Sequence, residues 1–404
     1  MTIGDAQPEA AGAKAPKRAR TALRFVLLVG AMSLFADFTY EGARSVIGPY
    51  LAVLGASAFV VSAVTGFGEF LGYSLRLVSG RLSDRTREFW PITILGYVLQ
   101  MSVVPLLAIA GSWQIAALFI ILERVGKATR NPPRDAMLAH AGHEVGGYGW
   151  AFGLHEALDQ AGALIGPLVV AAVLAARTAD YKLAFAVLAI PAGITLVILA
   201  IARLSYPRPE DLEARQGDLH PEGMSRMFWV YLVAATLVAA GFADFPLIAY
   251  RFHQSGTVTG ASVPIFYAVA MAVSGAGSLA FGKLFDRRGI GILVPLTIGC
   301  ALYAPLVFLG GFVPALVGAS LWGLGMGVHE SIVPAAVAHM VSPDQRASAY
   351  GLFTAGYGIA WFAGSVALGA LYTLSAGAAV AFAVIAEAAA VPFLIRVHRN
   401  FQPR

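Results

Sequence analysis

Long apolar segments recur along the whole chain, and each is near or above the roughly 20 residues that span a lipid bilayer. Hydrophobic residues make up 58% of the chain and charged residues only 13%, against roughly 25% charged residues in soluble domains. A soluble protein of this composition could not cover its surface with polar groups, so lipid is the expected solvent. We predict twelve helical spans at about 23–52, 58–80, 89–110, 113–138, 148–175, 181–204, 226–252, 261–282, 290–310, 313–340, 347–373 and 376–397.

A polar, proline-containing stretch separates the sixth predicted span from the seventh. The fold class that follows is an all-α membrane protein, with twelve transmembrane helices in two pseudo-symmetric six-helix bundles. The bundles are expected at 23–204 and 226–398, joined by a cytoplasmic linker at 205–225. Residues 1–22 and 399–404 are expected to be cytoplasmic tails, and the first is expected to be disordered because it is rich in Ala, Pro and basic residues.

Basic residues are distributed unevenly between the two sides of the predicted bundles. With the N-terminus inside, nineteen Lys and Arg residues lie in cytoplasmic segments, whereas the opposite loops carry Arg177 and Lys182, with Arg251 at a helix end. This positive-inside bias sets membrane orientation. We therefore expect both termini on the cytoplasmic side of a bacterial-type cytoplasmic (inner) membrane. The basic clusters form no face with interleaved aromatic residues, so no nucleic acid partner is expected.

The two halves of the chain repeat each other at a nearly constant spacing. The sequence FADF at 35–38 recurs at 242–245, an offset of 207, and GRLSDR at 80–85 recurs as GKLFDR at 282–287, an offset of 202. Such matches at corresponding helices predict duplicated bundles related by an axis along the membrane normal.

The segment 118–139 places several charges in one apolar span. Four of them recur at i, i+4, i+7 and i+11, on one face of a helix: Glu123, Lys127, Arg130 and Arg134. Each charge at mid-membrane costs roughly 2.5–3.5 kcal/mol on insertion scales. This face is therefore expected to look toward other protein or a wet cavity, and the rest of the chain would enclose it.

The first predicted helix carries Asp37, Glu41 and Arg44 at i, i+4 and i+7, so the three share a face. Ionisable groups within membrane spans are functional by default, and we interpret Asp37 and Glu41 as a carboxylate pair that binds and releases a proton. The alternative is an ion pair with Arg44 that only holds the helix against a neighbour. Glu69 and Arg76 share a face of the second helix, where we expect a structural pair.

The fifth helix adds a polar patch with His155 and Asp159 at i and i+4. His155 is a candidate proton relay or, with Asp159, half of a metal site, although two ligands are weak evidence for a metal. The alternative is that Asp159 neutralises Lys127 or Arg130 on the fourth helix.

The second half of the chain has candidates of its own. Asp244 duplicates Asp37 and is expected to line a central cavity, as is Glu330 near mid-depth of the tenth helix, with packing as the alternative for both. Among the aromatic residues we select Tyr40 and Trp361 as cavity-lining, against the alternatives of lipid contact and core packing.

No soluble catalytic constellation is present in the sequence, so an enzyme is not expected. The chain has neither a G-x-x-x-x-G-K-[ST] phosphate loop nor an H-E-x-x-H zinc motif. Cys300 is the single cysteine, which excludes an intramolecular disulfide and a cysteine-based zinc site. Neither a cofactor nor a resident metal is expected. Glu387 in the last helix is interpreted as a packing or oligomer contact.

Residues 80–87, GRLSDRTR, resemble the loop signature G-x-L-a-D-R-x-G-R of the major facilitator superfamily, with Thr86 where the family has glycine. The resemblance extends over residues 23–398. In this family the loop aspartate docks at a helix N-terminus of the other half and pairs with arginine, which closes the cytoplasmic side. The resemblance implies Asp84 in this role, with Arg130 or Arg134 as its partner. The implied gate comprises Gly80, Asp84, Arg85, Arg134, Asp286 and Arg287.

Residues 162–167, GALIGP, resemble the fifth-helix signature of antiporter members through Gly162, Gly166 and Pro167. The family resemblance implies secondary transport, in which a ligand binds at mid-membrane between two bundles that rock. The antiporter-like motif favours proton-coupled efflux of a small organic molecule. The expected partners are this substrate, protons and the lipid bilayer, and the protein is expected to function as a monomer.

Other functions stay open from the sequence. The basic face of the fourth helix favours proton-coupled symport of an organic anion, which Lys127 and Arg130 would attract. Metal-ion export is a third possibility, motivated by His155, Asp159, His329 and Glu330. A membrane-embedded sensor without flux belongs to another class, and charges at mid-depth in duplicated bundles disfavour it.

Overall fold

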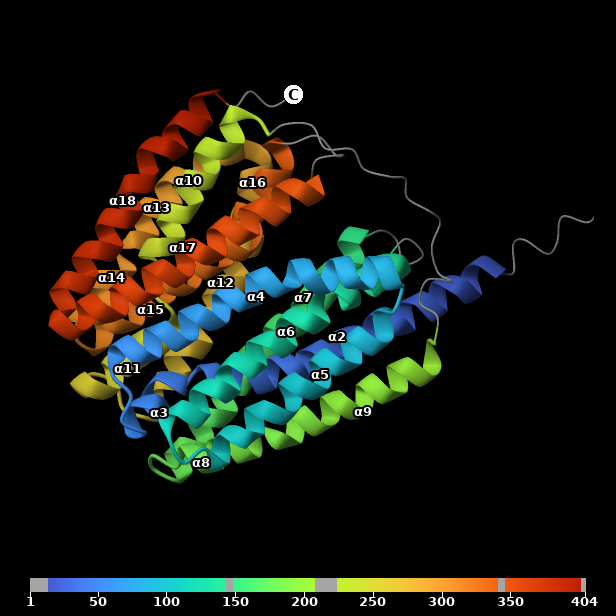
Figure 1. Ribbon diagram of the computed structural model, residues 1–404, viewed down its shortest axis with the longest axis horizontal. Helices are drawn as coiled ribbons and strands as arrows, with labels where there is room; N and C mark the ends of the chain where they lie inside the picture. The colour runs from blue at the N-terminus through green and yellow to red at the C-terminus, as the bar shows by residue number, and fades with distance from the viewer. Residues whose placement is uncertain (1–13, 143–147, 208–223, 341–345, 401–404) are drawn as a thin grey trace, which may run out of the picture.

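The computed structural model describes residues 14–142, 148–207, 224–340 and 346–400, which form helices joined by short turns, with no strand among them. Figure 1 shows these helices in two groups, with the first half of the chain in the lower group and the second half in the upper one. The predicted fold class, an all-α membrane protein built from two helical bundles, is confirmed.

The helices of the N-terminal bundle follow the predicted spans closely. Its elements are α2 (Lys14–Arg44), α3 (Ile47–Val53), α4 (Ala58–Thr86), α5 (Phe89–Leu106), η1 (Leu107–Ile109), α6 (Trp113–Gly142), α7 (Tyr148–Ala176), α8 (Tyr181–Val187) and α9 (Ala189–Ser205).

The C-terminal bundle contains more interruptions. Its elements are α10 (Arg226–Gly241), α11 (Phe245–Ser255), α12 (Ser262–Arg288), η4 (Gly289–Ile292), α13 (Leu293–Ala301), α14 (Tyr303–Leu309), α15 (Phe312–Gly327), the π-helical turn η5 (Val328–Ile332), α16 (Val333–Met340), α17 (Arg346–Leu374) and α18 (Ala376–Asn400).

Eleven helical spans in the described residues are long and apolar enough to cross a membrane. The long helix missing from this set is α6, because six charged residues occur between Glu123 and Asp135. It packs against α2, α4, α5 and α7, so neighbouring helices surround it. The predicted count of twelve spans therefore consists of eleven apolar spans and one charged helix that is enclosed by protein.

The N-terminal tail departs from the prediction of disorder over residues 1–22. Helix α2 begins at Lys14, because Ala, Lys and Arg are good helix formers and Pro16 lies in the first turn, where proline is tolerated. Residues 1–13 and most of the predicted linker, 208–223, lie outside the described part of the chain.

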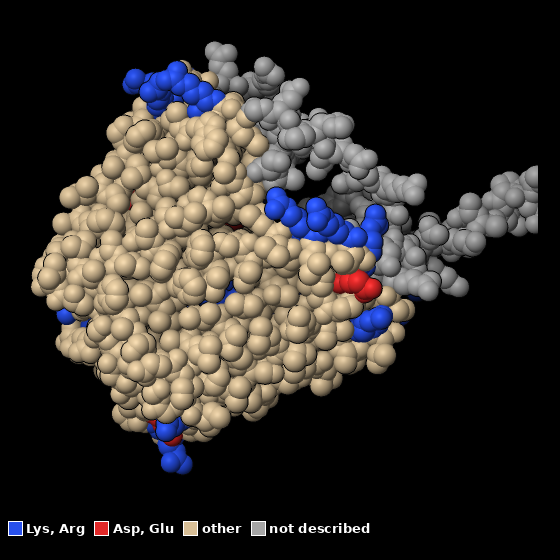
Figure 2. All heavy atoms as spheres, viewed as in Figure 1, with Lys and Arg blue, Asp and Glu red and all other residues tan. Residues whose placement is uncertain are grey.

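Exposed charged side chains lie mainly at the ends of the bundles. Figure 2 shows basic side chains over the ends of α4 and α18, and a broad face below them that is almost free of charge, as contact with lipid requires. We call this end of the molecule the basic end, and the end that contains α3, α8 and α11 the opposite end. The exposed arginines at the basic end include Arg81, Arg85, Arg87, Arg396 and Arg399.

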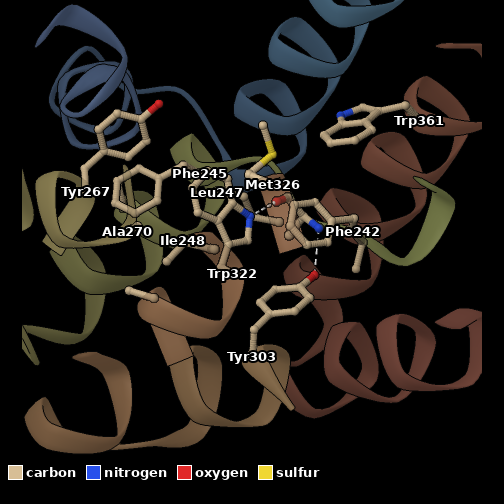
Figure 3. Close-up of a cluster of buried hydrophobic side chains, with 14 of the residues drawn as sticks. Phe242, Phe245, Leu247, Ile248, Tyr267, Ala270, Tyr303, Trp322, Met326 and Trp361 are labelled. Carbon is tan, nitrogen blue, oxygen red and sulfur yellow. Dashed lines mark hydrogen bonds between the residues drawn. The ribbon is translucent and has the colours of Figure 1, made fainter. Parts of the chain in front are cut away.

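The repeated FADF sequence takes a different backbone in the two bundles. The first copy lies inside α2, whereas the second contains the break between α10 and α11. At this break the Tyr303 hydroxyl donates to the Gly241 carbonyl oxygen at 2.9 Å and accepts from the Ala243 N–H at 2.6 Å. Trp322 Nε1 donates to the Ala243 carbonyl oxygen at 2.8 Å (Figure 3). Non-helical backbone is tolerated at membrane depth when it is buried and hydrogen-bonded in this way.

The two bundles approach each other closely at positions where one of the contacting residues is a glycine. At the opposite end, a Cβ atom on Gly48 of α3 would collide with the Pro246 carbonyl oxygen of α11. Between the ends, α4 runs along α17, and a Cβ atom on Gly358 would lie 3.0 Å from Tyr73 Cβ. The bundles therefore touch backbone to backbone at the opposite end.

Candidate functional site

A network of charged side chains lies between the two bundles. The Arg44 guanidinium of α2 lies 2.9 Å from a Glu69 oxygen of α4 and 3.6 Å from Asp244, which precedes α11. Arg124 of α6 lies 2.8 Å from the same Glu69 oxygen. The predicted pairing of Glu69 with Arg76 is wrong, because Arg44 and Arg124 occupy the Glu69 carboxylate. Helical spacing places residues on a common face but does not say which neighbour faces them.

Asp244 accepts hydrogen bonds from side chains of both bundles. Its carboxylate accepts from Thr65 Oγ1 of α4 at 3.3 Å, and from Ser365 Oγ and Trp361 Nε1 of α17 at 3.1 Å and 3.2 Å. Figure 3 places the Trp361 ring near Phe242, next to the break in the chain. The carboxylate that duplicates Asp37 therefore connects the N-terminal bundle to the C-terminal one.

Glu41 provides a second contact between the bundles. Its carboxylate accepts a hydrogen bond from the Tyr267 hydroxyl of α12. Asp37, one turn earlier on α2, turns instead to Arg130 of its own bundle at 3.4 Å. Asp37 and Glu41 thus have separate partners, one inside the N-terminal bundle and one across the space between bundles.

Arg130 is completely buried, and several acceptors satisfy its guanidinium. Its Nε donates to Gln100 Oε1 at 2.6 Å and its Nη1 to the Tyr97 hydroxyl at 2.8 Å, in addition to the Asp37 contact. Gln100 Nε2 in turn donates to Glu123 Oε1 at 2.6 Å. Most of the donors of a guanidinium can be used in such a fork, so the charged face of α6 is enclosed by α2 and α5.

Two cationic side chains of α6 lie against the Tyr40 ring of α2. Lys127 Nζ lies 3.9 Å from the ring centroid and Arg124 Cζ lies 4.9 Å from it, where the ring quadrupole attracts positive charge. The Tyr40 hydroxyl accepts from Arg44 Nη1 at 2.9 Å. Unlike the two arginines, Lys127 has no carboxylate oxygen within 4.0 Å among the described residues.

A second polar cluster lies nearer the basic end, where α2, α6 and α7 meet. Ser33 Oγ accepts from Arg134 Nη1 at 3.0 Å and lies 2.9 Å from His155 Nε2. His155 Nδ1 lies 3.4 Å from Asp159. Asp159 does not form the alternative ion pair with Lys127 or Arg130, because the i, i+4 spacing places His155 beside it instead.

The four residues of the metal-export alternative do not gather at one place. His155 and Asp159 lie in the N-terminal bundle, whereas His329 packs among aromatic rings of the C-terminal bundle. Glu330 is exposed and lies within electrostatic reach of Lys127. Over the described ranges, no three His, Cys, Asp or Glu side chains are placed to hold a metal ion. The structure therefore does not bring these four residues together as a metal site.

Five of the six predicted gate residues lie in the last two turns of α4 and α12, and Arg134 lies on α6. Arg85 and Arg287 are exposed, and a Cβ atom on Gly80 would lie 3.5 Å from a proline side chain of α6. The side chains of Asp84 and Asp286 lie outside what the structure describes, so their docking stays a prediction.

The two arginines proposed to receive Asp84 already have partners. Arg130 contacts Asp37 at 3.4 Å, and Arg134 contacts the adjacent Asp135 at 2.7 Å. Docking of Asp84 at either arginine would compete with these contacts.

The antiporter-like motif lies where α7 packs on α2. A Cβ atom on Gly162 would collide with the Leu34 carbonyl oxygen, and one on Gly166 with the Phe38 carbonyl oxygen. Pro167 follows inside α7. The two glycines thus bring α7 against the segment of α2 that carries Asp37.

Comparison with known proteins agrees with this architecture. A family model described as Major Facilitator Superfamily matches residues 27–365. The chain belongs to the Major Facilitator Superfamily. An uncharacterized protein of Mycobacterium bovis is 41% identical over 404 residues, with 98% of each chain covered. An uncharacterized MFS-type transporter of Methanocaldococcus jannaschii is 26% identical over 362 residues, with 87% of this chain and 89% of the other covered.

The solved structure of the nucleoside transporter NupG has the same fold. It matches with a TM-score of 0.71 at 14% identity, covering 94% of this chain and 100% of its own. Membership in the Major Facilitator Superfamily means that this multi-pass membrane protein performs secondary transport of a substrate and is not an enzyme. The resemblance to the Major Facilitator Superfamily is confirmed, whereas the antiporter-like character suggested by the fifth-helix motif stays a prediction.

The sequence pattern did not single out several polar members of this Major Facilitator Superfamily site. They are uncharged side chains within apolar spans: Ser33, Thr65, Tyr97, Gln100 and Ser365. Burying such groups is costly unless they are hydrogen-bonded, and a glutamine inside an apolar helix such as α5 is the clearest signal of this kind. Tyr40 and Trp361, which were selected, both contact the charged network.

Proposed function

We propose that this Major Facilitator Superfamily member is a proton-coupled exporter of a small organic molecule, working by alternating access in the bacterial cytoplasmic membrane. Both termini lie in the cytoplasm, so the basic end faces the cytoplasm, and the monomer is the working unit. The observation that carries this proposal is the position of two carboxylates, Glu41 and Asp244, at contacts that cross between the bundles.

A carboxylate at such a contact couples proton binding to bundle movement. Ionised Glu41 accepts from the Tyr267 hydroxyl, and ionised Asp244 attracts Arg44. Hydrogen bonds to charged groups are stronger than those between neutral groups. A proton on either carboxylate therefore changes the strength with which the bundles hold together, which links protonation to the conformational equilibrium.

Asp37 is the carboxylate at which substrate and proton exchange places. Its side chain is 13% exposed, whereas the Asp244 side chain is 1% exposed, so Asp37 is the more accessible of the two repeats. A substrate group that binds ionised Asp37 is displaced when a proton binds there, which is the competition that antiport requires. Arg130 balances the Asp37 charge when neither is bound.

The test uses purified protein in liposomes that contain a trapped pH dye. A panel of small organic cations, zwitterions and anions is added outside, and internal pH is recorded. We expect one compound class to drive proton movement opposite to its own, and Asp37→Asn to abolish this coupled movement. Unchanged coupled movement in Asp37→Asn would remove Asp37 from the mechanism, and substrate counterflow without any proton movement would refute proton coupling.

A matched control variant is Asp180→Asn. Asp180 lies before α8 at the opposite end, and its side chain accepts from the Leu183 N–H. Asparagine is an equally good N-cap residue, so this variant changes one aspartate to asparagine without disturbing the helix or the network. Its coupled transport is expected to equal that of the wild type.

A second candidate function, proton-coupled uptake of an organic anion, is favoured by Lys127. This ammonium group lies against Tyr40 without a carboxylate partner, so it is available to a negatively charged ligand. Under an inward-directed proton gradient, symport predicts accumulation of an anion and export predicts its removal. Lys127→Gln is expected to raise the KM for an anion about tenfold, corresponding to roughly 1.4 kcal/mol, with Lys127→Arg as the charge-retaining control.

A further inference from the structure

A small cavity lies inside the C-terminal bundle, away from the network between the bundles. Its volume is about 20 Å³, and a single water molecule needs roughly 10–15 Å³ on this measure. Most of the lining is apolar, from α10, α13, α15, η5, α16 and α18. The polar side chains in the lining are Tyr231, Thr297, Cys300, His329, Tyr357 and Glu387.

Three of these side chains carry a polar atom without a partner. His329 Nδ1, the Tyr357 hydroxyl and Glu387 Oε1 have no hydrogen-bond partner in the part of the chain that the structure describes. The three residues are 8%, 3% and 1% exposed. Buried polar atoms are almost always satisfied by protein or by water, and a buried water typically has two to four polar partners. Three such atoms around one cavity therefore form a site for a water molecule.

Glu387 sits in this cavity without a basic partner. Its Cγ would lie 3.0 Å from a Cβ atom on Gly241, so α18 packs tightly on α10 there. No Lys or Arg nitrogen lies within 4.0 Å of its carboxylate among the described side chains. The titratable groups that face it from neighbouring elements are neutral tyrosines, a thiol and an imidazole: Tyr231, Cys300, Tyr303, His329 and Tyr357. An isolated ionised carboxylate in such surroundings is strongly disfavoured, so the neutral acid is the form that fits.

We propose that this cavity is a second proton site, in which protonated Glu387 shares one bound water molecule with His329 and Tyr357. The site goes beyond the proposed export function, because it lies within one bundle and uses none of the carboxylates between the bundles. Its ligand is a proton together with the water that carries it.

The site is placed to influence Asp244. The His329 ring lies 4.4 Å from the Phe242 ring and 5.8 Å from the Trp361 ring, measured between centroids. Trp361 Nε1 donates to Asp244. Loss of the proton from Glu387 would place a negative charge in the cavity, and His329 and Trp361 would carry that change to the contact between the bundles.

The test is infrared spectroscopy of the full chain in lipid, which detects the carbonyl stretch of a protonated carboxylic acid. We expect a protonated-acid band at neutral pH that disappears in Glu387→Gln and persists in Glu88→Gln, the matched change at an exposed glutamate in the turn before α5. Tyr357→Phe is expected to shift the band, because it removes one partner of the shared water. The Gln side chain has nearly the same shape as protonated Glu, so the variant is expected to fold.

Two outcomes would overturn the proposal. An unchanged protonated-acid band in Glu387→Gln would mean that Glu387 is ionised, and a band unaffected by Tyr357→Phe and by exchange into heavy water would rule out the shared water. The measurement needs no transported substrate, so its failure is distinct from failure of the proposed export function. We also expect Glu387→Gln to change the pH dependence of the transport rate and to leave the affinity for substrate unchanged.

Discussion

The FADF sequence occurs once in each bundle, but its aspartate is held differently in the two places. Asp37 lies inside the continuous helix α2 and pairs with one arginine of its own bundle. Asp244 lies at the break before α11 and meets three hydrogen-bond donors and an arginine, drawn from both bundles. Duplication supplied the same residue twice, and the helix break turned the second copy toward the interface.

This difference separates an accessible carboxylate from a buried one that joins the bundles. A group with many fixed donors holds its neighbours in place through several hydrogen bonds. A group with one partner and partial exposure can change its proton or its ligand with less disturbance. We therefore expect neutralising substitutions at the two aspartates to have different effects on transport and stability, although the local sequences are identical.

The largest effect is expected from Asp244→Asn. The change removes the charge that faces Arg44 and places an amide among donors, and breaking a buried ion pair costs roughly 3–5 kcal/mol. Transport and thermal stability in detergent should both fall sharply. Asp37→Asn should abolish proton coupling with a much smaller drop in melting temperature. Equal drops for the two variants would show that the helix break does not distinguish the two repeats.

The next prediction compares the two bundles at corresponding glycines, one in α7 and one in α17, where each helix packs against a neighbour in its own bundle. A Cβ atom on Gly162 would collide with the Leu34 carbonyl oxygen, and one on Gly364 with the Ala240 carbonyl oxygen. Overpacking of this kind costs roughly 1–3 kcal/mol, occasionally more, and a rigid backbone favours the upper value. Gly162→Ala and Gly364→Ala should therefore lower the melting temperature by similar amounts.

Gly299→Ala is the control for this pair. Gly299 lies in α13 with nothing within 4 Å of an added Cβ, and alanine is the better helix former by about 1 kcal/mol. Its stability should stay the same or rise. A large loss in only one of the two packed glycine variants would mean that the bundles differ in rigidity, and not only at the repeated aspartate.

The fold could be predicted from the sequence because lipid imposes a simple rule on each helix. Apolar runs of sufficient length must be helices, so the predicted span at 58–80 corresponds to Ala58–Thr86 and the span at 376–397 to Ala376–Asn400. The charged face of α6 had to be enclosed, and Gln100 and Tyr97 of α5 help to enclose it.

The partners within the site could not be predicted in the same way. Periodicity shows that Asp37, Glu41 and Arg44 share a face, but their partners come from α4, α6, α12 and the start of α11. The break at the second FADF copy also depends on residues far away in sequence, Tyr303 and Trp322. Contacts of this kind arise from the relative rotation of helices, about which the apolar pattern of one helix carries no information.

The smallest of the three effects tests what holds that break. Tyr303→Phe removes one hydroxyl that serves both the Gly241 carbonyl oxygen and the Ala243 N–H. Each lost hydrogen bond costs on the order of 1 kcal/mol, so the loss should be about 2 kcal/mol and appear as a lower melting temperature. Tyr97→Phe is the counterpart in the N-terminal bundle, where the hydroxyl serves side chains beside a continuous helix. If Tyr97→Phe were as damaging as Tyr303→Phe, the break would not depend on Tyr303, and the contrast between the two aspartates would need another cause.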